Sequence, residues 1–504
     1  MIRALACSAL LTPLLAAAPY TADDESLSAH TAAPEWFQDA KLGIYFHWGP
    51  YSVPAYHNEW YPFYMNRPGH KVFQHHVENY GHPKDVGYHE FVKDFTGENF
   101  DAAEWAQLFK AAGARFAGPV AEHHDGFSMW DSDVTPWNAA DRGPKQDILG
   151  NLFAELRKRE VKTLATFHHA RQLQRYPAEE APADDTDRFQ SKEKFRFDSH
   201  YTNWKGWPTS SDDPELQFLY GNMPEAKWVD EVWQGKLSEV TEKYQPDIIW
   251  FDAWLDSVPE PARLKFAANY LNAAKEWQRE VVIVRKNEDM PLSYSVNDHE
   301  KSREPKAAEL PWMTDDTISY GSWCYTEGMK VKPLSEIVHA LIDTVSKNGV
   351  TLLNIAPKAN GEIPQEQRDA LTGLGEWLET NGEGIYETRP WATFGEGPTK
   401  EPEGGFSNHQ KFQNLKYSSA DVRYTRSKDG KTVYAFFLGQ PDEGERVLTA
   451  FTTTEIGTVP SVKSVTKLGD DESSFDYKLS DEGLEIELSE LNKTPALGLK
   501  IELE

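Results

Sequence analysis

Histidines, tryptophans and carboxylates occur together at four places where a predicted strand ends. The clusters are residues 46–49, residues 57–61, residues 122–127 and residues 250–252. Aromatic rings can cover the apolar face of a pyranose, while imidazole and carboxylate groups can fix its hydroxyls. Four such clusters at strand ends therefore indicate a carbohydrate site more readily than isolated structural histidines would.

Asp252 is the residue around which this site is expected to form. It ends the apolar run Ile248-Ile249-Trp250-Phe251, which is typical of a strand buried on both faces in a parallel sheet. Burying a charged carboxylate is costly, so Asp252 should lie where the strand leaves the core. Catalytic groups collect at that end of a parallel barrel. The spacing also fits an aspartate that caps the following helix.

Glycoside hydrolysis requires a second carboxylate. Candidates gather in residues 297–304, where Asp298, Glu300 and Glu304 are all present. The spacing alone does not choose among them, and a solvated charged loop is the other interpretation of this segment.

Metal binding is a competing interpretation, because histidine pairs occur at His75-His76, His123-His124 and His168-His169. Adjacent residues of a strand point to opposite faces, so such a pair rarely supplies two ligands to one ion. The sequence contains no HExxH motif, EF-hand loop or cysteine-based zinc spacing. It also lacks a GxSxG elbow and a P-loop, which argues against a serine hydrolase or an NTPase. We expect no metal and no cofactor.

Strand and helix patterns alternate over about 350 residues. Apolar runs predict strands at residues 41–49, 116–121, 161–167, 248–251, 281–284 and 350–355. Helical periodicity predicts helices at residues 102–112, 148–156, 229–240, 264–277, 334–345 and 370–378. This order predicts an α/β fold, a (β/α)8-like TIM barrel with long loops.

The domain organisation follows from shifts in composition. Residues 1–18 have Arg3, an apolar run and three alanines, as in a secretory signal peptide, and residues 19–34 resemble a flexible leader. The barrel is expected over residues 35–392, with a long functional loop at residues 170–226. A Gly- and Pro-containing linker covers residues 393–405. Short alternating runs at residues 433–437, 484–488 and 497–503 then predict an antiparallel β-sandwich over residues 406–504.

Composition limits the partners and the compartment. The net charge of −28 over 504 residues argues against nucleic acid and anionic membrane surfaces as partners. No segment approaches a transmembrane helix. The signal peptide predicts a periplasmic or secreted protein. Its removal would leave Cys324 and not Cys7, and therefore no intramolecular disulfide. The oligomeric state stays open.

The region between about residues 35 and 391 resembles the retaining α-L-fucosidases of glycoside hydrolase family 29. The resembling segments are residues 36–37, 41–49, 59–61, 123–127 with Trp130, 250–252, 321–325, 352–358, 381–386 and 388–391. The segments HHDGF and LLNIAPK are each specific, and their order matches as well.

The resemblance implies a (β/α)8-like barrel followed by a β-sandwich. It implies hydrolysis of terminal α-L-fucose from fucosylated glycans, with retention, through a covalent fucosyl-enzyme. Asp252 falls on the nucleophile of the family. The positions that hold the fucose ring correspond to His47, Glu59, Trp60, His123, His124 and Trp250.

The sequence departs from the family pattern at several of these places. His168 stands where the family often has a tyrosine near the nucleophile. Glu122 stands where a lysine is common, and this change is expected to reshape the floor of the pocket. The segment Pro311-Trp312-Met313 lacks a glutamate that is frequent in the family. Alignment places the acid/base on Glu300, with Glu304 in reserve, and makes Arg285 a substrate contact.

The hypothesis is that Asp252 attacks the anomeric carbon while Glu300 protonates the leaving oxygen and later activates water. Two alternatives stay open. One is an inactive, lectin-like barrel protein that binds fucose, and the other is a metal-dependent barrel hydrolase.

Overall fold

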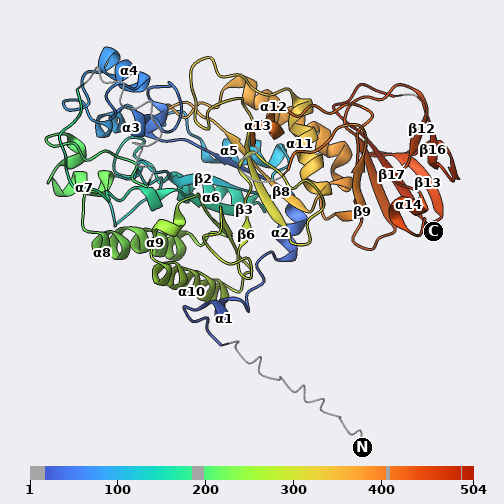
Figure 1. Ribbon diagram of the computed structural model, residues 1–504, viewed down its shortest axis with the longest axis horizontal. Coiled ribbons are helices and arrows are strands. Elements are labelled where there is room, and N and C mark those ends of the chain that lie inside the picture. Colours follow the sequence, from blue (N-terminus) through green and yellow to red (C-terminus); the bar gives the residue numbers. More distant parts are fainter. Residues whose placement is uncertain (1–17, 184–197, 404–408, 490) are drawn as a thin grey trace, which may run out of the picture.

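A parallel barrel and a pair of antiparallel sheets lie side by side in the computed structural model (Figure 1). The structure describes residues 18–183, 198–403, 409–489 and 491–504. The predicted signal peptide therefore lies outside the described residues, apart from Ala18.

Eight parallel strands form the barrel, in the order β6-β5-β4-β3-β2-β1-β8-β7. They are β1 Leu42–Phe46, β2 Phe116–Glu122, β3 Lys162–Phe167, β4 Ile248–Phe251, β5 Val282–Arg285, β6 Val296–Asn297, β7 Trp312–Thr317 and β8 Gly349–Ile355. A single parallel bridge between Asp298 and Met313 joins β6 to β7, so the ring of strands is closed. The predicted α/β barrel is confirmed.

Helices cover the barrel between most strands. They are α5 Ala102–Ala111, α6 Ile148–Lys158, α9 Gln234–Tyr244, α10 Glu260–Trp277, α11 Leu334–Ser346 and α12 Gln365–Asn381, and a π-helix, η7 Trp228–Trp233, leads into α9. Asp101 caps α5 by accepting hydrogen bonds from the amides of Ala103 and Glu104, as expected from its capping-box sequence.

The segments between β5, β6 and β7 contain no helix in the described structure. Strands β6 and β7 did not appear in the sequence prediction. Strand β6 is two residues long, and β7 carries Asp315 and Asp316 in place of a continuous apolar run. Loops of residues 286–295 and 298–311 therefore lie where a regular barrel would have helices.

Two insertions pack on each other at the end of the barrel to which the strands point. One carries α3 Tyr61–Tyr64, α4 Lys71–Asn79 and the 3₁₀ helix η2 Tyr88–Lys93, and the other carries η3 His169–Arg171, η6 Pro208–Ser210, α7 Pro214–Tyr220 and α8 Glu225–Lys227. Phe73 of the first insertion forms a small buried cluster with Trp204 and Trp207 of the second. The long loop predicted at residues 170–226 thus contains short helices in its described part.

The expectation of a flexible leader at residues 19–34 is wrong. Residues 24–27 form α1 (Asp24–Leu27), which lies beside α10 (Figure 1), and Leu27 is fully buried. The backbone N–H of Tyr20 donates to Asn272 Oδ1 at 2.7 Å, and Asn272 Nδ2 donates back to the Tyr20 carbonyl at 2.9 Å. Apolar burial and paired backbone groups hold this segment on the barrel. A further short helix, α2 Glu35–Ala40, then leads into β1.

The C-terminal part is an antiparallel sandwich, as predicted. One sheet has the order β14-β13-β17-β11-β10-β9 and the other has the order β12-β16-β15, and their apolar faces share one core. The strands are β9 Arg389–Glu396, β10 Val422–Arg426, β11 Thr432–Phe437, β12 Gly444–Leu448, β13 Val462–Lys467, β14 Asp470–Ser474, β15 Asp476–Ser480, β16 Gly483–Leu488 and β17 Leu497–Leu503. The short helix α14 Thr453–Ile456 belongs to it, whereas α13 His409–Gln413 lies beside α11 and α12 (Figure 1), with Phe412 against the guanidinium of Arg303.

The predicted boundary at residue 392 needs correction, whereas the one at residue 405 lies outside the described residues. Strand β9 crosses the expected end of the barrel domain and pairs with β10 of the sandwich, because its backbone groups complete the edge of that sheet. A buried ionic network also ties the two parts together, since Asp343 of α11 contacts Arg423 of β10 at 2.6 Å and Lys347 at 2.8 Å.

None of the helices in the described ranges is both long and apolar enough to span a lipid bilayer. Cys324 is a buried free thiol, and Cys7 lies outside the described residues.

Candidate active site

A cavity of about 1140 Å³ opens at the carboxyl ends of the barrel strands. Its walls include eight of the residues predicted for the site, which are His47, Glu59, Trp60, His123, His168, Asp252, Arg285 and Glu300. The sequence clusters that seemed separate along the chain therefore meet in one place.

Strand register explains why these side chains converge. Phe167, Phe251 and Arg285 are paired across β3, β4 and β5. The next residue of each strand is His168, Asp252 or Lys286, so these three polar side chains emerge side by side. Residues in equivalent positions of neighbouring parallel strands point the same way.

Asp252 is held by three cationic or imidazole groups. Lys286 Nζ lies 3.1 Å from its Oδ1, and His124 Nε2 and His168 Nδ1 each lie 3.3 Å from its Oδ2. Burial alone would raise the pKa of Asp252, but Lys286 and the two histidines outweigh it and hold the pKa well below its usual range. Asp252 is therefore an ionised carboxylate.

Glu300 shares the same ammonium group. Lys286 Nζ lies 3.0 Å from Glu300 Oε2, so one atom contacts both carboxylates. This geometry is compatible with the spacing of about 5–5.5 Å between the carboxyl groups of retaining glycosidases. Burial raises the pKa of Glu300 above its usual value, and Asp315 and Asp252 add to the rise while Lys286 opposes it. The pKa of Glu300 is thus raised and that of Asp252 is lowered, as a general acid and a nucleophile require.

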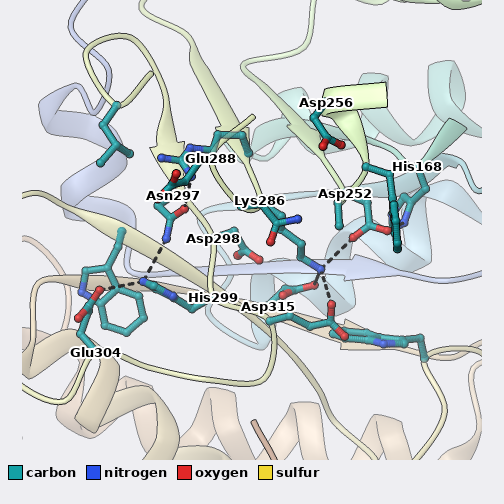
Figure 2. A pocket seen from close by; sticks show the side chains of 18 of the residues that line it. His168, Asp252, Asp256, Lys286, Glu288, Asn297, Asp298, His299, Glu304 and Asp315 are labelled. Carbon is teal, nitrogen blue, oxygen red and sulfur yellow. Dashed lines mark hydrogen bonds and ion pairs between the residues drawn. The ribbon is translucent and has the colours of Figure 1, made fainter. Parts of the chain in front are cut away.

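The other two carboxylate candidates have different surroundings. Glu304 Oε1 lies 2.9 Å from His299 Nε2, and this hydrogen bond lowers its pKa. Figure 2 shows Glu304 and His299 on the side of the cavity away from Asp252 and His168. Burial and the neighbouring Asp315 raise the pKa of Asp298 well above its usual value. Glu300 alone among the three shares a cation with Asp252.

His47 presents one ring nitrogen to the cavity in a fixed tautomer. Asn354 Nδ2 donates to the carbonyl of Trp323 at 2.7 Å, which orients its Oδ1 toward His47. His47 Nδ1 then donates to that oxygen at 2.7 Å and leaves Nε2 as an acceptor. Burial lowers the pKa of His47 and of His123 well below the usual value, so both rings are neutral. Neutral imidazoles suit the hydroxyls of a sugar.

Glu59 and Trp60 also line the cavity. Glu59 Oε2 accepts a hydrogen bond from the backbone N–H of Trp323 at 3.2 Å. The guanidinium of Arg171 lies 4.3 Å from the ring centre of Trp60 and 5.0 Å from that of Trp254. Arg171 is fully buried, and its nitrogens have no hydrogen-bond partner among the described residues. It therefore stabilises these rings by cation–π contact.

Three predicted positions need correction. Trp250 does not line the cavity, because its ring is fully buried below Lys286, whose Nζ lies 4.7 Å from the ring centre. Glu122 does not reach the floor of the cavity either, since it is buried in an ion pair with Lys236 at 2.8 Å. His124 lies behind Asp252 and is absent from the cavity wall.

Arg285 lines the cavity, but Lys286 is the residue that contacts Asp252. Arg285 donates from Nη1 to Asn297 Oδ1 at 2.8 Å. The two residues are adjacent at the end of β5, and alternation sends them to different sides. The sequence prediction missed Lys286. Lys286 directly follows β5, as Asp252 directly follows β4. This equivalent position is the signal that could have identified Lys286.

Among the described residues, two groups at or beside the cavity have the composition of a metal site. They are His47 with His123 and His168, and His124 with His168 and Asp252, and within each group the possible ligand atoms lie within 4.8 Å of one another. The pairs His123-His124 and His168-His169 each supply one ring to the first group and His47 supplies the third, so the possible ligands come from the ends of three strands and not from one pair. The same nitrogens serve equally as hydrogen-bond partners for hydroxyls.

Comparison with known proteins gives one consistent family. A family model described as alpha-L-fucosidase matches residues 9–383, and a model of the alpha-L-fucosidase C-terminal domain matches residues 413–502. The tissue alpha-L-fucosidase of Homo sapiens is 29% identical over 490 residues, covering 94% of this chain and 88% of the relative. The plasma alpha-L-fucosidase of Pongo abelii is 30% identical over 441 residues, covering 84% of this chain and 80% of the relative.

Solved structures agree with these relatives. The crystal structure of Thermotoga maritima alpha-fucosidase is similar with a TM-score of 0.70 and 26% identity, and covers 96% of this chain and 100% of that chain. A complex of the Thermotoga maritima enzyme with a mechanism-based inhibitor is similar with a TM-score of 0.71 and 25% identity, over the same shares.

Proposed function

The chain belongs to the α-L-fucosidase family of glycoside hydrolases, and on that premise we propose that Asp252 and Glu300 carry out its retaining hydrolysis of terminal α-L-fucosides. The observation that carries this assignment is the single ammonium of Lys286 in contact with both carboxylates. The lectin-like alternative has no support, since both carboxylates required for hydrolysis are present.

In the first step, Asp252 attacks the anomeric carbon and forms an ester with fucose. The bond to the leaving oxygen breaks, and Glu300 donates its proton to that oxygen. Asp252 is ionised by its neighbours and Glu300 has a raised pKa, so each group starts in the protonation state that the step requires.

In the second step, Glu300 acts as the base. Ester formation removes the negative charge of Asp252, which had raised the pKa of Glu300, while Lys286 remains beside it. The carboxylate form of Glu300 is then favoured and accepts a proton from water. The water attacks the anomeric carbon from the face that the aglycone left, the ester bond to Asp252 breaks to regenerate its carboxylate, and fucose leaves with its configuration retained.

Residues around the nucleophile recognise the fucose ring. His47 Nε2 and the neutral ring of His123 form hydrogen bonds with hydroxyls of fucose. Glu59 accepts a hydrogen bond from a further hydroxyl. Trp60 and Trp323 offer apolar faces on the cavity wall. His168 orients Asp252 from the position that the family often gives to a tyrosine.

The test compares azide rescue in three variants. Asp252→Gly should lower kcat by several orders of magnitude, and azide should then give the inverted fucosyl azide by direct displacement. Glu300→Gln should lose activity mainly toward poor leaving groups, and azide should give the retained product from the fucosyl-enzyme. If Glu304→Gln gives the retained fucosyl azide and Glu300→Gln gives none and keeps its activity, the acid/base is Glu304.

We also propose that the protein is periplasmic or secreted, on the basis of the charged and apolar N-terminal pattern of residues 1–18. Mass analysis of the N-terminus of the native protein should find a chain that begins near residue 19. An intact Met1 on protein recovered from the cytoplasm would contradict this.

A further inference from the structure

The cavity continues well beyond the place of the fucose ring. On the side away from Asp252 its walls include residues of the loops 286–295 and 298–311, which lie where a regular barrel would have helices. We call this region the outer lobe and define it by the lining residues Glu288, Leu292, Glu304, Glu309, Leu310 and Pro311. Figure 2 shows Glu288, Asn297, His299 and Glu304 on this side, with Lys286 and Asp298 between them and Asp252.

The outer lobe lies where the leaving group must be. Glu300 protonates the oxygen that joins fucose to the aglycone, so the aglycone extends past Glu300 and away from Asp252. A cavity of about 1140 Å³ exceeds the range of about 300–1,000 Å³ that holds drug-sized ligands, so it has room for sugars beyond one fucose.

The charge of the outer lobe is negative. Glu288 and Glu309 are exposed and make no ion pair with any described residue, whereas Glu304 is hydrogen-bonded to the imidazole of His299 and also feels the charges of Lys306 and Lys347. The two cationic side chains of the lining are already engaged. Lys286 contacts three carboxylates, and Arg285 is bound to Asn297 and flanked by Asp289 and Glu288. An anionic aglycone would therefore meet uncompensated like charge.

The lobe also offers apolar surface. Leu310 is 58% exposed and Leu292 is 41% exposed, and both lie in the cavity wall beside Pro311 and Trp312. Exposed large aliphatic side chains in a cavity indicate a ligand with an apolar face. Neutral pyranosides have such a face and carry hydroxyls for the carboxylates to bind.

We infer that the outer lobe is an aglycone subsite for uncharged sugars, and that its carboxylates select against sulfated and carboxylated aglycones. The inference rests on the proposed function, because it takes the position of the aglycone from the role of Glu300. Selection acts through like-charge repulsion, so it must weaken as ionic strength rises.

The experiment compares two substrates that differ only in the charge of the aglycone. One is fucosyllactose, and the other is the same trisaccharide with a sulfate on a lactose hydroxyl. The ratio of kcat/KM for the neutral over the sulfated substrate should be about ten or more at low salt. It should fall toward one in high salt.

Variants assign the effect to the lobe. Glu288→Gln and Glu309→Gln should each lower the ratio about two- to fivefold, and the double variant should lower it further. Glu482→Gln removes an exposed carboxylate of the sandwich and should leave the ratio unchanged. The same ratio in the double variant and in the wild type, or a ratio near one at low salt, would overturn the inference. Failure of the proposed function has a different signature, since then the azide products would assign the acid/base to a residue other than Glu300, whatever the ratio of the two substrates.

Discussion

Lys286 Nζ lies 3.1 Å from Asp252 Oδ1, at the ends of neighbouring strands β5 and β4. Only 7% of the Lys286 side chain and 14% of the Asp252 side chain are exposed, so the pair is weakly screened. The same ammonium contacts Glu300 and Asp315. Lys286 therefore sets the charge state of the whole catalytic group, and most of the predictions below concern it.

Lys286→Met should lower kcat by about 10²–10³-fold, since one preorganised charge at a reacting centre contributes that much. The pH profile should also move. Lys286 lowers the pKa of both Asp252 and Glu300, so its loss raises both, and both limbs of kcat/KM should shift to higher pH. Lys286→Arg keeps the charge and should restore part of the rate. A loss of rate that is the same at every pH, with no shift of either limb of the profile, would mean that Lys286 acts only structurally.

The wild-type pH profile should be governed on its alkaline side by Glu300. Burial, Asp315 and Asp252 raise the pKa of this group above 4.5, and the first step requires its protonated form. Activity should therefore fall as pH rises through the raised pKa. Asp252 stays ionised throughout this range, because its pKa is well below 3.8.

The measurement that tests this is the pH dependence of steady-state kcat/KM in Glu300→Gln. The alkaline limb should disappear when an aryl fucoside with an activated leaving group is used, whereas Glu304→Gln should retain it. A limb that persists in Glu300→Gln would belong to another group.

Lys236 and Glu122 form an ion pair in which neither side chain is exposed, and Ser128 Oγ donates to the other carboxylate oxygen at 2.6 Å. Lys236→Met should destabilise the fold by about 3–5 kcal/mol, because it leaves a buried charge unpaired. Urea denaturation gives the free energy of unfolding. The double variant Lys236→Met with Glu122→Gln should be less destabilised than Lys236→Met alone. Equal losses of unfolding free energy in the single and the double variant would show that packing and not charge is responsible.

Asp125 predicts a pH dependence of stability. Burial raises its pKa to about 7 although Tyr88 donates a hydrogen bond to it at 2.6 Å. The folded state then holds a proton that the unfolded state has lost above about pH 4, so this group stabilises the fold at low pH. The contribution should decline as pH rises from about 4 to about 7. The thermal midpoint of Asp125→Asn should show a smaller decline over that range than that of the wild type.

Chelation separates hydrolysis by carboxylates from metal catalysis. The two histidine groups of the cavity have ligand atoms within 4.8 Å of one another, but the proposed steps use none of them as metal ligands. EDTA should leave kcat/KM unchanged. A loss of activity that zinc restores would instead support the metal-dependent hydrolase.

The sequence determined the local elements and the chemical type of the site. Apolar runs that end in a polar residue gave β3, β4 and the position of Asp252 at a strand end, and the short motifs gave the family. Strands β6 and β7 were missed because a two-residue strand and a strand with internal aspartates carry little periodic signal. The ordered leader was missed because its burial depends on α10, about 250 residues away.

Tertiary structure alone decided which of the candidate residues meet. The choice of Glu300 among three carboxylates, and of Lys286 beside Asp252 in place of Arg285, depends on strand register and on which side of the barrel end each residue faces. A shift of one residue would reverse those directions, and no local propensity encodes it. Glu122 faces Lys236 of α9 because it alternates with His123. Trp250 points the same way as Asp252 but lies deeper in the barrel, below Lys286.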